Sequence, residues 1–225
     1  MPKRHDPFAK AAVIETYLAE TPRKVPGLAD LHRMAMLLLS ECAQKDADIL
    51  VVGAGGGMEL KALAEARPGW SFVGVDPSGP MLKMARLQVK DIVQRVKLIE
   101  GTIDVVPADQ FDGATCLLVL HFLDKSERLN TLMQIHRRLK PGARLVVAHH
   151  SAGASDAALW LARSAAFAAR ATVSWETASA TGAVMAAALP LLFASEEEAL
   201  MRKAGFESVE LFYSAFSFKG WVATA

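Results

Sequence analysis

The sequence has few of the residues and motifs that identify a class of protein directly. Only two cysteines occur among its 225 residues, Cys42 and Cys116, and they lie far apart in apolar contexts. A reduced interior explains them most simply. Because the cysteines are isolated and no His-x-x-x-His pair occurs, the sequence predicts no metal site. The Gly-x-Ser-x-Gly motif is also absent, which leaves a hydrolase with a nucleophile elbow without support.

Long apolar runs and an excess of charge are missing as well. The longest charge-free apolar stretch, Ala183 to Ala194, is too short to span a bilayer and contains Pro190. The first residues are not followed by the apolar segment of a signal peptide. The formal net charge of +1 gives no general basis for binding nucleic acid. With 52% hydrophobic and 22% charged residues, the sequence predicts a folded, cytoplasmic protein without a membrane or nucleic-acid partner.

The most informative stretch is a glycine-rich segment that follows a run of apolar residues. Ile49–Val52 predicts a buried strand, residues 53–57 include four glycines, and a helical pattern begins directly after them. Glycines let a ligand approach the main chain closely, and free N–H groups at a helix start can face its oxygen atoms. A second predicted strand, 71–76, ends in Asp76, where a nucleotide-binding fold places an acid for the ribose hydroxyls. A dinucleotide fingerprint would need a glycine in place of Met58, so the pattern argues against it.

From residue 47 on, predicted strands and helices alternate. This alternation predicts right-handed crossovers and a mostly parallel sheet with helices on both faces. The spacing of two final strands, Ser208–Phe212 and Phe216–Ala223, predicts an antiparallel hairpin. The predicted parallel strands are 48–53, 71–76, 96–100, 114–120 and 144–148, and the predicted helices between and after them are 57–67, 81–94, one from Asp124 to about 139, and one capped by Ser195 and Glu198 that ends near 205.

We expect a single domain over residues 1–225 with two additions to the sheet. Residues 1–46 predict an N-terminal helical cap built from helices at 7–21 and 28–42. The alanine-rich stretch 151–194 predicts a helix only in its first half, and we interpret it as a helical lid over a substrate pocket rather than an outer helix with a long connection. Side chains of this stretch that could line an apolar pocket or contact an acidic acceptor, or could equally serve packing and solvation, are Trp160, Phe167, Trp175, Phe193, Arg163 and Arg170.

Several stretches together resemble the class I S-adenosyl-L-methionine (SAM)-dependent methyltransferases, most closely the branch of carboxy-S-adenosylmethionine synthase-like enzymes. The resemblance covers nearly the whole chain. It implies a doubly wound α/β, Rossmann-like sheet of seven strands, SAM as cofactor with S-adenosyl-L-homocysteine as product, and a small-molecule methyl acceptor. It leaves the oligomeric state open, and a homo-oligomer is one of the alternatives. The stretches that carry it are the glycine turn, Arg23–Gly27, Gly74–Leu82, Ile99–Ile103, Leu120–Leu129, Leu139–Val146 and Lys203–Phe218.

The resemblance also implies roles for individual residues. The glycine turn would face the methionine part of SAM, Asp76 its ribose, and Pro77, Thr102 and Ile103 its adenine. Residues 117–120 would end the fourth strand beneath the sulfonium. The implied cofactor-binding residues are Gly53, Ala54, Gly55, Gly57, Asp76, Pro77, Met81, Thr102, Ile103, Leu117, Leu118 and Phe122.

Departures from the synthase branch favour SAM over a carboxylated SAM. Leu28 and Leu117 replace a tyrosine and an asparagine, Thr102 replaces an aspartate of the wider family, and Arg170 stands in a poorly matching context. A bound carboxylate needs a cation and polar donors, because burying it without partners is costly.

Three histidines are the candidates for a general base. His121 follows the fourth predicted strand, and His149 and His150 follow the fifth, at the sheet edge where such folds bind ligands. Each could instead be a hydrogen-bonded structural residue. The resulting prediction is a SAM-dependent methyltransferase. A carboxy-SAM synthase-like enzyme, a SAM-binding protein without catalysis and, with least support, a nicotinamide oxidoreductase stay open.

Overall fold

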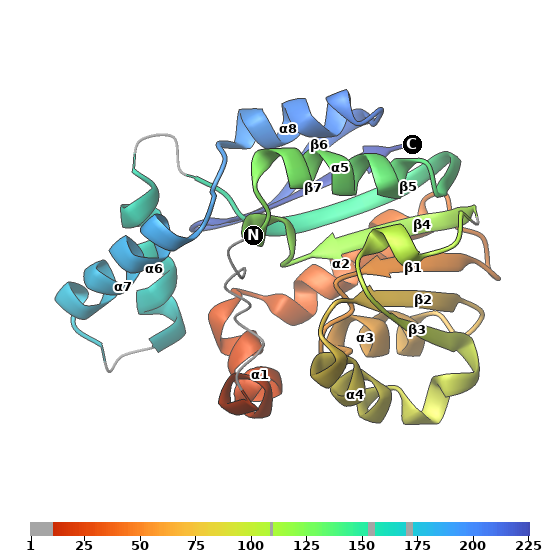
Figure 1. Cartoon of the computed structure of the whole chain (residues 1–225), viewed down its shortest axis with the longest axis horizontal. Helices are drawn as coiled ribbons and strands as arrows, with labels where there is room; N and C mark the ends of the chain where they lie inside the picture. The colour runs from red at the N-terminus through yellow and green to blue at the C-terminus, as the bar shows by residue number, and fades with distance from the viewer. Residues whose placement is uncertain (1–10, 109, 153–155, 170–172) are drawn as a thin grey trace.

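The computed structural model describes residues 11–108, 110–152, 156–169 and 173–225. A seven-stranded sheet forms its centre, in the order β3-β2-β1-β4-β5-β7-β6 (Figure 1). The first five strands are parallel, and β7 is antiparallel to both β5 and β6. The predicted α/β fold with an antiparallel C-terminal hairpin is therefore confirmed. The strands are β1 (Asp48–Val52), β2 (Ser71–Asp76), β3 (Val96–Glu100), β4 (Phe111–Leu117), β5 (Leu139–His150), β6 (Glu207–Ala215) and β7 (Phe218–Thr224).

Helices cover both faces of the sheet and bury an apolar core on each side. Leu31, Leu60 and Leu82 belong to the core on one face, and Leu132 and Met201 to the core on the other. This division follows from the right-handed crossovers that connect parallel strands. The covering helices are α2 (Leu28–Ser40), α3 (Met58–Ala66) and α4 (Gly79–Gln88) on the first face and α5 (Lys125–His136) and α8 (Ala194–Lys203) on the second (Figure 1).

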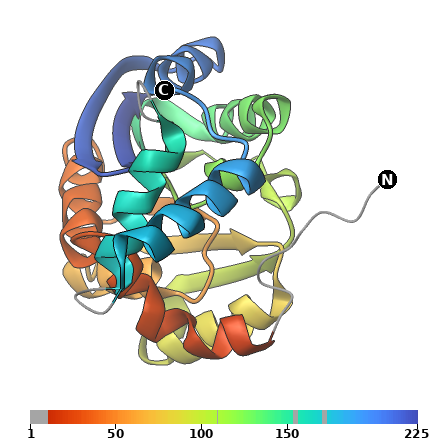
Figure 2. The same cartoon turned by 90° about the vertical axis from the view of Figure 1, so that its left-hand side faces the viewer.

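Three further helices stand beside the sheet rather than on it. These are α1 (Ala11–Lys24), α6 (Ala157–Ala169) and α7 (Trp175–Ala188), and Figure 2 shows α6 and α7 side by side with α1 next to them. The prediction that 151–194 is helical only in its first half is wrong, because α7 fills most of the second half. Its backbone approaches α6 so closely that a Cβ on Gly182 would lie 2.5 Å from the Ala158 carbonyl oxygen. Only glycine fits at this crossing.

Two predicted strand ends are wrong in a way that moves site residues. β4 ends at Leu117, because Leu118 takes a left-handed conformation with φ of 62°. The next residues form the short 3₁₀ helix η4 (Leu120–Phe122). β5 runs to His150, since both of its last residues pair with β7, so the two histidines lie in the strand and not after it.

Three helix boundaries also differ from the prediction. α4 stops at Gln88, and residues 90–95 form the 3₁₀ helix η2 (Lys90–Arg95). α8 begins at Ala194 instead of after Ser195, because the Glu196 carboxylate accepts the N–H of Phe193 and closes the first turn there. α1 continues past the predicted end of the first helix, and the predicted residues 7–10 lie outside the described part of the chain. The predicted cap of α5 by Asp124 and Glu127 is confirmed.

Candidate active site

The glycine turn between β1 and α3 is bent by three residues in the left-handed region. Gly53, Gly55 and Gly57 have φ of 78°, 47° and 83°. A Cβ on Gly53 would also lie 2.1 Å from a methyl group of Val119. The turn therefore depends on glycine both for its conformation and for the close approach of the segment that follows β4.

Asp76 closes this turn from the end of β2. One carboxylate oxygen accepts the N–H of Gly55 at 2.9 Å, and the other accepts the N–H of Ser78 at 2.8 Å. A carboxylate is an acceptor-only group with several lone pairs, which is the chemistry that binds ribose hydroxyls. The carboxylate, the positive-φ turn and the helix start behind it fit the ribose and methionine parts of SAM.

Tyr17 of α1 covers the turn, a contact that sequence reasoning missed. A Cβ on Gly56 would lie 3.0 Å from the Tyr17 ring, and one on Gly55 would lie 3.4 Å from its hydroxyl oxygen. Burial raises the pKa of Tyr17 to about 12, and the nearby Asp76 and Glu59 add to this effect. The hydroxyl therefore stays protonated, and it shares a hydrogen bond with the Thr21 side chain.

Glu59, at the start of α3, is a buried acid beneath the same turn. It is 7% exposed, and burial raises its pKa to about 7 despite the neighbouring Thr115. Oε1 of Glu59 and Oγ1 of Thr115 have no hydrogen-bond partner among the described residues. The carboxylate is thus costly to ionise in the folded protein.

We expect Glu59→Gln to stabilise the protein at pH 8 but not near pH 4.5. A folded-state pKa above the unfolded value means that the folded state binds more protons, so stability falls as pH rises from about 4.5 through about 7. Removing the charge restores about 3 kcal/mol at the upper end, at 1.36 kcal/mol per pKa unit. Urea unfolding at both pH values measures it, with the exposed Glu65→Gln on the same helix as control. An equal effect of Glu59→Gln at both pH values would show that its ionisation does not contribute.

The residues expected around the adenine lie at the ends of β2 and β3. Pro77 and Thr102 are exposed, whereas Met81 and Ile103 are buried, and the Gly101 N–H donates to the Asp76 carbonyl. The Thr102 hydroxyl donates to the Asp104 carboxylate at 3.0 Å. These residues lie beside Asp76 on the β3 side of the sheet, opposite to β4, where the adenine is expected.

The segment after β4 lies against the glycine turn. Leu117 is buried, its neighbour Leu118 is half-buried with its N–H bonded to the Ala148 carbonyl, and Val119 contacts Gly53. Phe122 is 40% exposed and lies 4.1 Å from the His121 ring, centroid to centroid. The structure thus brings together the implied residues of the turn, of Asp76 and of this segment at one edge of the sheet.

The three candidate histidines do not share one environment. His149 and His150 are neighbours on β5, and their side chains leave opposite faces of the strand. His149 is fully buried, with Nε2 3.0 Å from the Glu197 carboxylate and its ring beside Trp221. His150 faces the other side, 5.0 Å from the buried ring of His121. The structure therefore brings His121 and His150 together and leaves His149 in the core.

His149 on β5 lies against a buried ionic cluster that joins α5 and α8. The Arg128 guanidinium pairs with the Glu197 carboxylate, and both side chains are fully buried. Arg128 also donates to the carbonyls of Leu123, after η4, and Pro190, before α8. The cluster fixes the chain at both of these connections, and its loss is expected to unfold more than one element.

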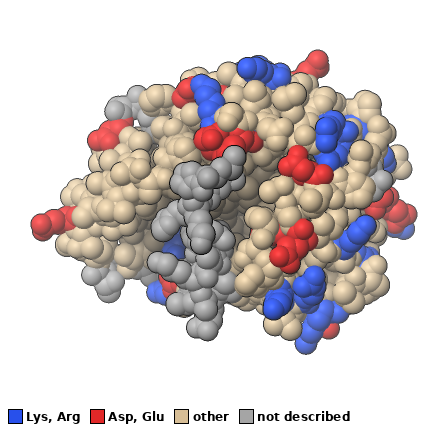
Figure 3. Space-filling model, in the orientation of Figure 1, with Lys and Arg blue, Asp and Glu red and all other residues tan. Residues whose placement is uncertain are grey.

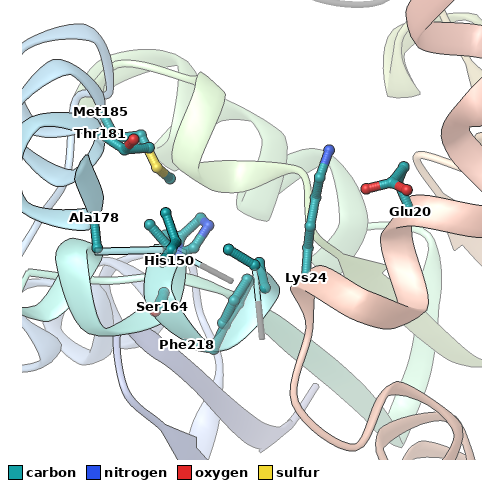
Figure 4. A pocket seen from close by; sticks show the side chains of 12 residues that line it. Glu20, Lys24, His150, Ser164, Ala178, Thr181, Met185 and Phe218 are labelled. Carbon is teal, nitrogen blue, oxygen red and sulfur yellow. The ribbon is translucent and has the colours of Figure 1, made fainter. Parts of the chain in front are cut away.

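A cavity of about 360 Å³ lies between α1, α6, α7 and the ends of β5 and β7. Figure 4 shows His150, Ser164 and Phe218 between the side chains of α7 on one side and Lys24 and Glu20 of α1 on the other. The walls are mostly apolar, with alanines, a valine, a methionine and a phenylalanine. Its lining residues are Glu20, Lys24, His150, Ser164, Ala165, Ala168, Ala169, Val173, Ala178, Thr181, Met185 and Phe218.

Both histidines near this cavity are neutral at neutral pH. Burial lowers the pKa of His150 to about 3, with a smaller contribution from His149. Burial lowers the pKa of His121 well below its usual value, and its Nδ1 has no hydrogen-bond partner in the described part of the chain. Neutral imidazoles keep a lone pair that can accept a proton, but a full imidazolium is costly here.

The aromatic and cationic candidates of the 151–194 stretch lie apart from the cavity lining. Trp160 is stacked under Arg163, with the guanidinium carbon 4.3 Å from the ring centroid. Phe167, Trp175 and Phe193 are 43%, 53% and 50% exposed. None of these five lines the cavity, and Arg170 lies outside the described residues. Among the described residues there is also no cluster of His, Cys, Asp and Glu able to hold a metal ion, and no helix long and apolar enough to cross a membrane.

Comparison with known proteins points to one family. The family model described as a methyltransferase domain matches residues 50–145. A carboxy-S-adenosyl-L-methionine synthase from Colwellia psychrerythraea is 28% identical over 141 residues, which make up 61% of this chain and 58% of that protein. The chain thus spans little more than half of that relative's length. The synthase of the same name from Actinobacillus succinogenes is 24% identical over 218 residues, 94% of this chain and 90% of that protein.

Solved structures share the fold at lower identity. The pyocyanin biosynthetic protein PhzM superposes with a TM-score of 0.66 and 22% identity, over 94% of this chain and 61% of that one. At this identity the likeness concerns the fold alone.

Proposed function

We propose that this chain, which carries a methyltransferase domain at residues 50–145, transfers the methyl group of SAM to a small molecule bound in the cavity between α1, α6 and α7. The cofactor would supply the activated methyl group, and the protein would supply alignment and a water-excluding pocket. The proposal includes the glycine turn, Asp76 and the segment after β4 as the cofactor site. It also takes the chain as one domain in which α6 and α7 act as the cover of the acceptor pocket.

One face of α1 carries the observation that supports this proposal best. Tyr17, Glu20 and Lys24 are spaced by three and four residues, so they lie on one side of the helix. Tyr17 contacts the glycine turn, whereas Glu20 and Lys24 line the cavity. At 1.5 Å per residue, Tyr17 and Lys24 are about 10 Å apart along the axis. A single helix thus borders both proposed binding sites.

The segment after β4 offers a second connection between the two sites. Val119 contacts Gly53 of the turn, and His121, two residues on, lies beside His150 of the cavity. An acceptor held against His150 would thus lie beside the segment that contacts the glycine turn. This arrangement supports in-line attack on a methyl group bound above the turn.

The side chains that line the cavity limit the kinds of acceptor that could bind there. Most of it is apolar, and two polar groups deep within it, on His150 and Ser164, can bond an O–H or N–H group. We therefore propose a small, largely apolar acceptor that is methylated on a protic oxygen or nitrogen.

A carboxy-SAM synthase-like activity is the second candidate, and the names of the curated relatives favour it. It would require a cation for the added carboxylate, and Lys24 on the cavity could supply one. Turnover of prephenate with SAM, followed by mass spectrometry of the sulfonium product, discriminates between the two activities.

The test of the proposal is formation of S-adenosyl-L-homocysteine with a panel of small phenols, alcohols and amines. We expect at least one acceptor to be methylated. For that acceptor, Thr181→Trp, which fills the cavity from α7, should raise KM at least tenfold and leave SAM affinity unchanged. Ala183→Trp, exposed on the same helix and outside the lining, is the matched control. SAM binding without turnover of any acceptor would instead favour a non-catalytic SAM-binding protein.

A further inference from the structure

A buried chain of three side chains begins and ends on the cavity. His150 Nδ1 lies 2.8 Å from Ser217 Oγ, and Ser217 Oγ lies 2.6 Å from Ser164 Oγ. All three residues are less than 10% exposed, and both His150 and Ser164 line the cavity. Ser164 and Ser217 are 53 residues apart and come from α6 and the β6–β7 turn. A polar chain of this kind is costly to bury unless its members satisfy one another.

The Ser217 hydroxyl proton can point to either of its two neighbours, which gives two arrangements of the hydrogen atoms of this chain. The Ser164 oxygen already accepts the N–H of Ser217 at 3.3 Å. If Ser217 donates its single hydroxyl proton to Ser164, then His150 Nδ1 must donate to Ser217. If Ser217 donates to His150 instead, then Ser164 must donate to Ser217. The two arrangements differ by the shift of one proton along each link.

The ring of His150 is held so that its other nitrogen is available. It is stacked on Phe218 with 3.9 Å between the ring centroids, and its Nδ1 is taken by Ser217. Among the described residues, Nε2 of His150 has no hydrogen-bond partner. The titratable groups around the ring are the imidazole of His121, 5.0 Å away, the imidazole of His149, and Lys24 and Glu20 across the cavity. Burial and the neighbouring His149 disfavour a positive charge on His150.

We propose that His150, Ser217 and Ser164 form a proton relay that lets His150 take the proton of the methyl acceptor without becoming charged. This inference rests on the proposed function; His150 is the base that contacts the acceptor, and Ser217 and Ser164 are positioning residues that act through it. In the resting state His150 carries its proton on Nδ1, donates to Ser217, and leaves Nε2 open to the cavity. Ser217 donates to Ser164, whose hydroxyl proton faces the cavity.

The proposed step balances in protons and charge. As the acceptor oxygen or nitrogen bonds to the methyl carbon and the carbon–sulfur bond breaks, the acceptor proton moves to His150 Nε2. The Nδ1 proton passes to Ser217, the Ser217 proton passes to Ser164, and the Ser164 proton leaves to water in the cavity. The second hydrogen-bond arrangement results. It resets after the product leaves, when His150 Nε2 releases its proton to solvent, Ser164 takes up a proton from solvent, and the intervening protons shift back to Ser217 and to Nδ1. The imidazole is neutral before and after, which removes the cost of an imidazolium in this buried position.

The first test reads the protonation of His150 directly and needs no turnover. Correlation spectra of ¹⁵N-labelled protein distinguish a proton on Nδ1 from one on Nε2, and His150→Gln assigns the signal. We expect the Nδ1–H form in the wild type from pH 5 to pH 8. Ser217→Ala should shift it toward the Nε2–H form, and the exposed Ser214→Ala should not. An Nε2–H form in the wild type, or an unchanged signal in Ser217→Ala, would overturn the relay.

The second test uses the first acceptor methylated by the wild type. Ser164→Ala breaks the far end of the relay and leaves the contact between His150 and Ser217 in place. We expect kcat to fall about 100-fold, the lower end of the range for general-base assistance, with SAM affinity unchanged. A wild-type kcat in Ser164→Ala would overturn the relay while leaving the methyltransferase proposal intact. Failure of the wild type to methylate any acceptor would overturn that proposal instead.

Discussion

Arg128→Ala is expected to lower the free energy of unfolding by about 3–5 kcal/mol, the range for breaking one partner out of a buried ion pair. The replacement leaves the Glu197 carboxylate uncompensated where neither side chain is exposed to solvent. It also leaves the carbonyls of Leu123 and Pro190 without the donors that Arg128 supplies. Urea unfolding followed by circular dichroism measures the loss.

Two further variants test whether the loss of stability comes from leaving a buried charge unpaired rather than from removing a charge as such. Lys125→Ala removes an exposed pair with Glu196 between the same two helices and should cost about 0–1 kcal/mol. The double variant Arg128→Met and Glu197→Leu should recover part of the loss, because no unpaired charge remains buried. A loss below 1 kcal/mol for Arg128→Ala would contradict the role assigned to the cluster.

Asp76→Ala is expected to weaken SAM binding by about 1–3 kcal/mol, the scale of lost hydrogen bonds to a charged group. This corresponds to about a 5- to 150-fold higher Kd. The carboxylate is proposed to bind the ribose hydroxyls, and it also fixes the Gly55 N–H at the centre of the turn. Removal therefore affects both the ligand contact and the shape of the turn.

The matched control is Asp91→Ala, an exposed aspartate of η2 away from the turn. It should leave SAM affinity unchanged. Isothermal titration of both variants measures the difference. An unchanged affinity in Asp76→Ala would remove Asp76 from the cofactor site.

Local features of the site could be predicted from the sequence. The apolar strand, the glycines and Asp76 lie within 28 residues, and the pattern 49–76 is sufficient to predict their arrangement. The resemblance to class I SAM-dependent methyltransferases is supported by the family match at residues 50–145, and the predicted fold is confirmed by the sheet order. The last hairpin was also predictable, because its two strands are neighbours in sequence.

The wrong predictions concern the ends of several strands and helices, and the helix α7, whose two faces do not differ in hydrophobicity. α7 is so rich in alanine that its buried positions, Ala178 and Gly182, cannot be told from its exposed ones by hydrophobicity. The apolar run that predicts β5 stops at Ala148, whereas the strand continues to His150 because its last residues pair with β7. This pairing joins residues far apart in sequence, so the opposite orientation of His149 and His150 is not evident from the sequence.

The residues that sequence reasoning missed all act across long sequence separations. Tyr17 contacts the glycine turn 38 residues away, and Ser164 meets Ser217 across 53 residues. Serines and a tyrosine carry no local motif, so single-sequence reasoning has no means to pair them. Tyr17 and Glu20 are three residues apart in the predicted first helix, which indicates a shared surface but not what it faces; Lys24 lies beyond the predicted end of that helix.

The central claim is that the glycine turn and Asp76 bind SAM, and one measurement tests it most directly. Purified protein, stripped of any bound ligand, is titrated calorimetrically with SAM and, as a control, with NAD. The account predicts micromolar binding of SAM and none of NAD, which would leave the acceptor as the remaining question. No heat with SAM, from protein that is folded by circular dichroism, would contradict the cofactor assignment and with it the proposed methyl transfer.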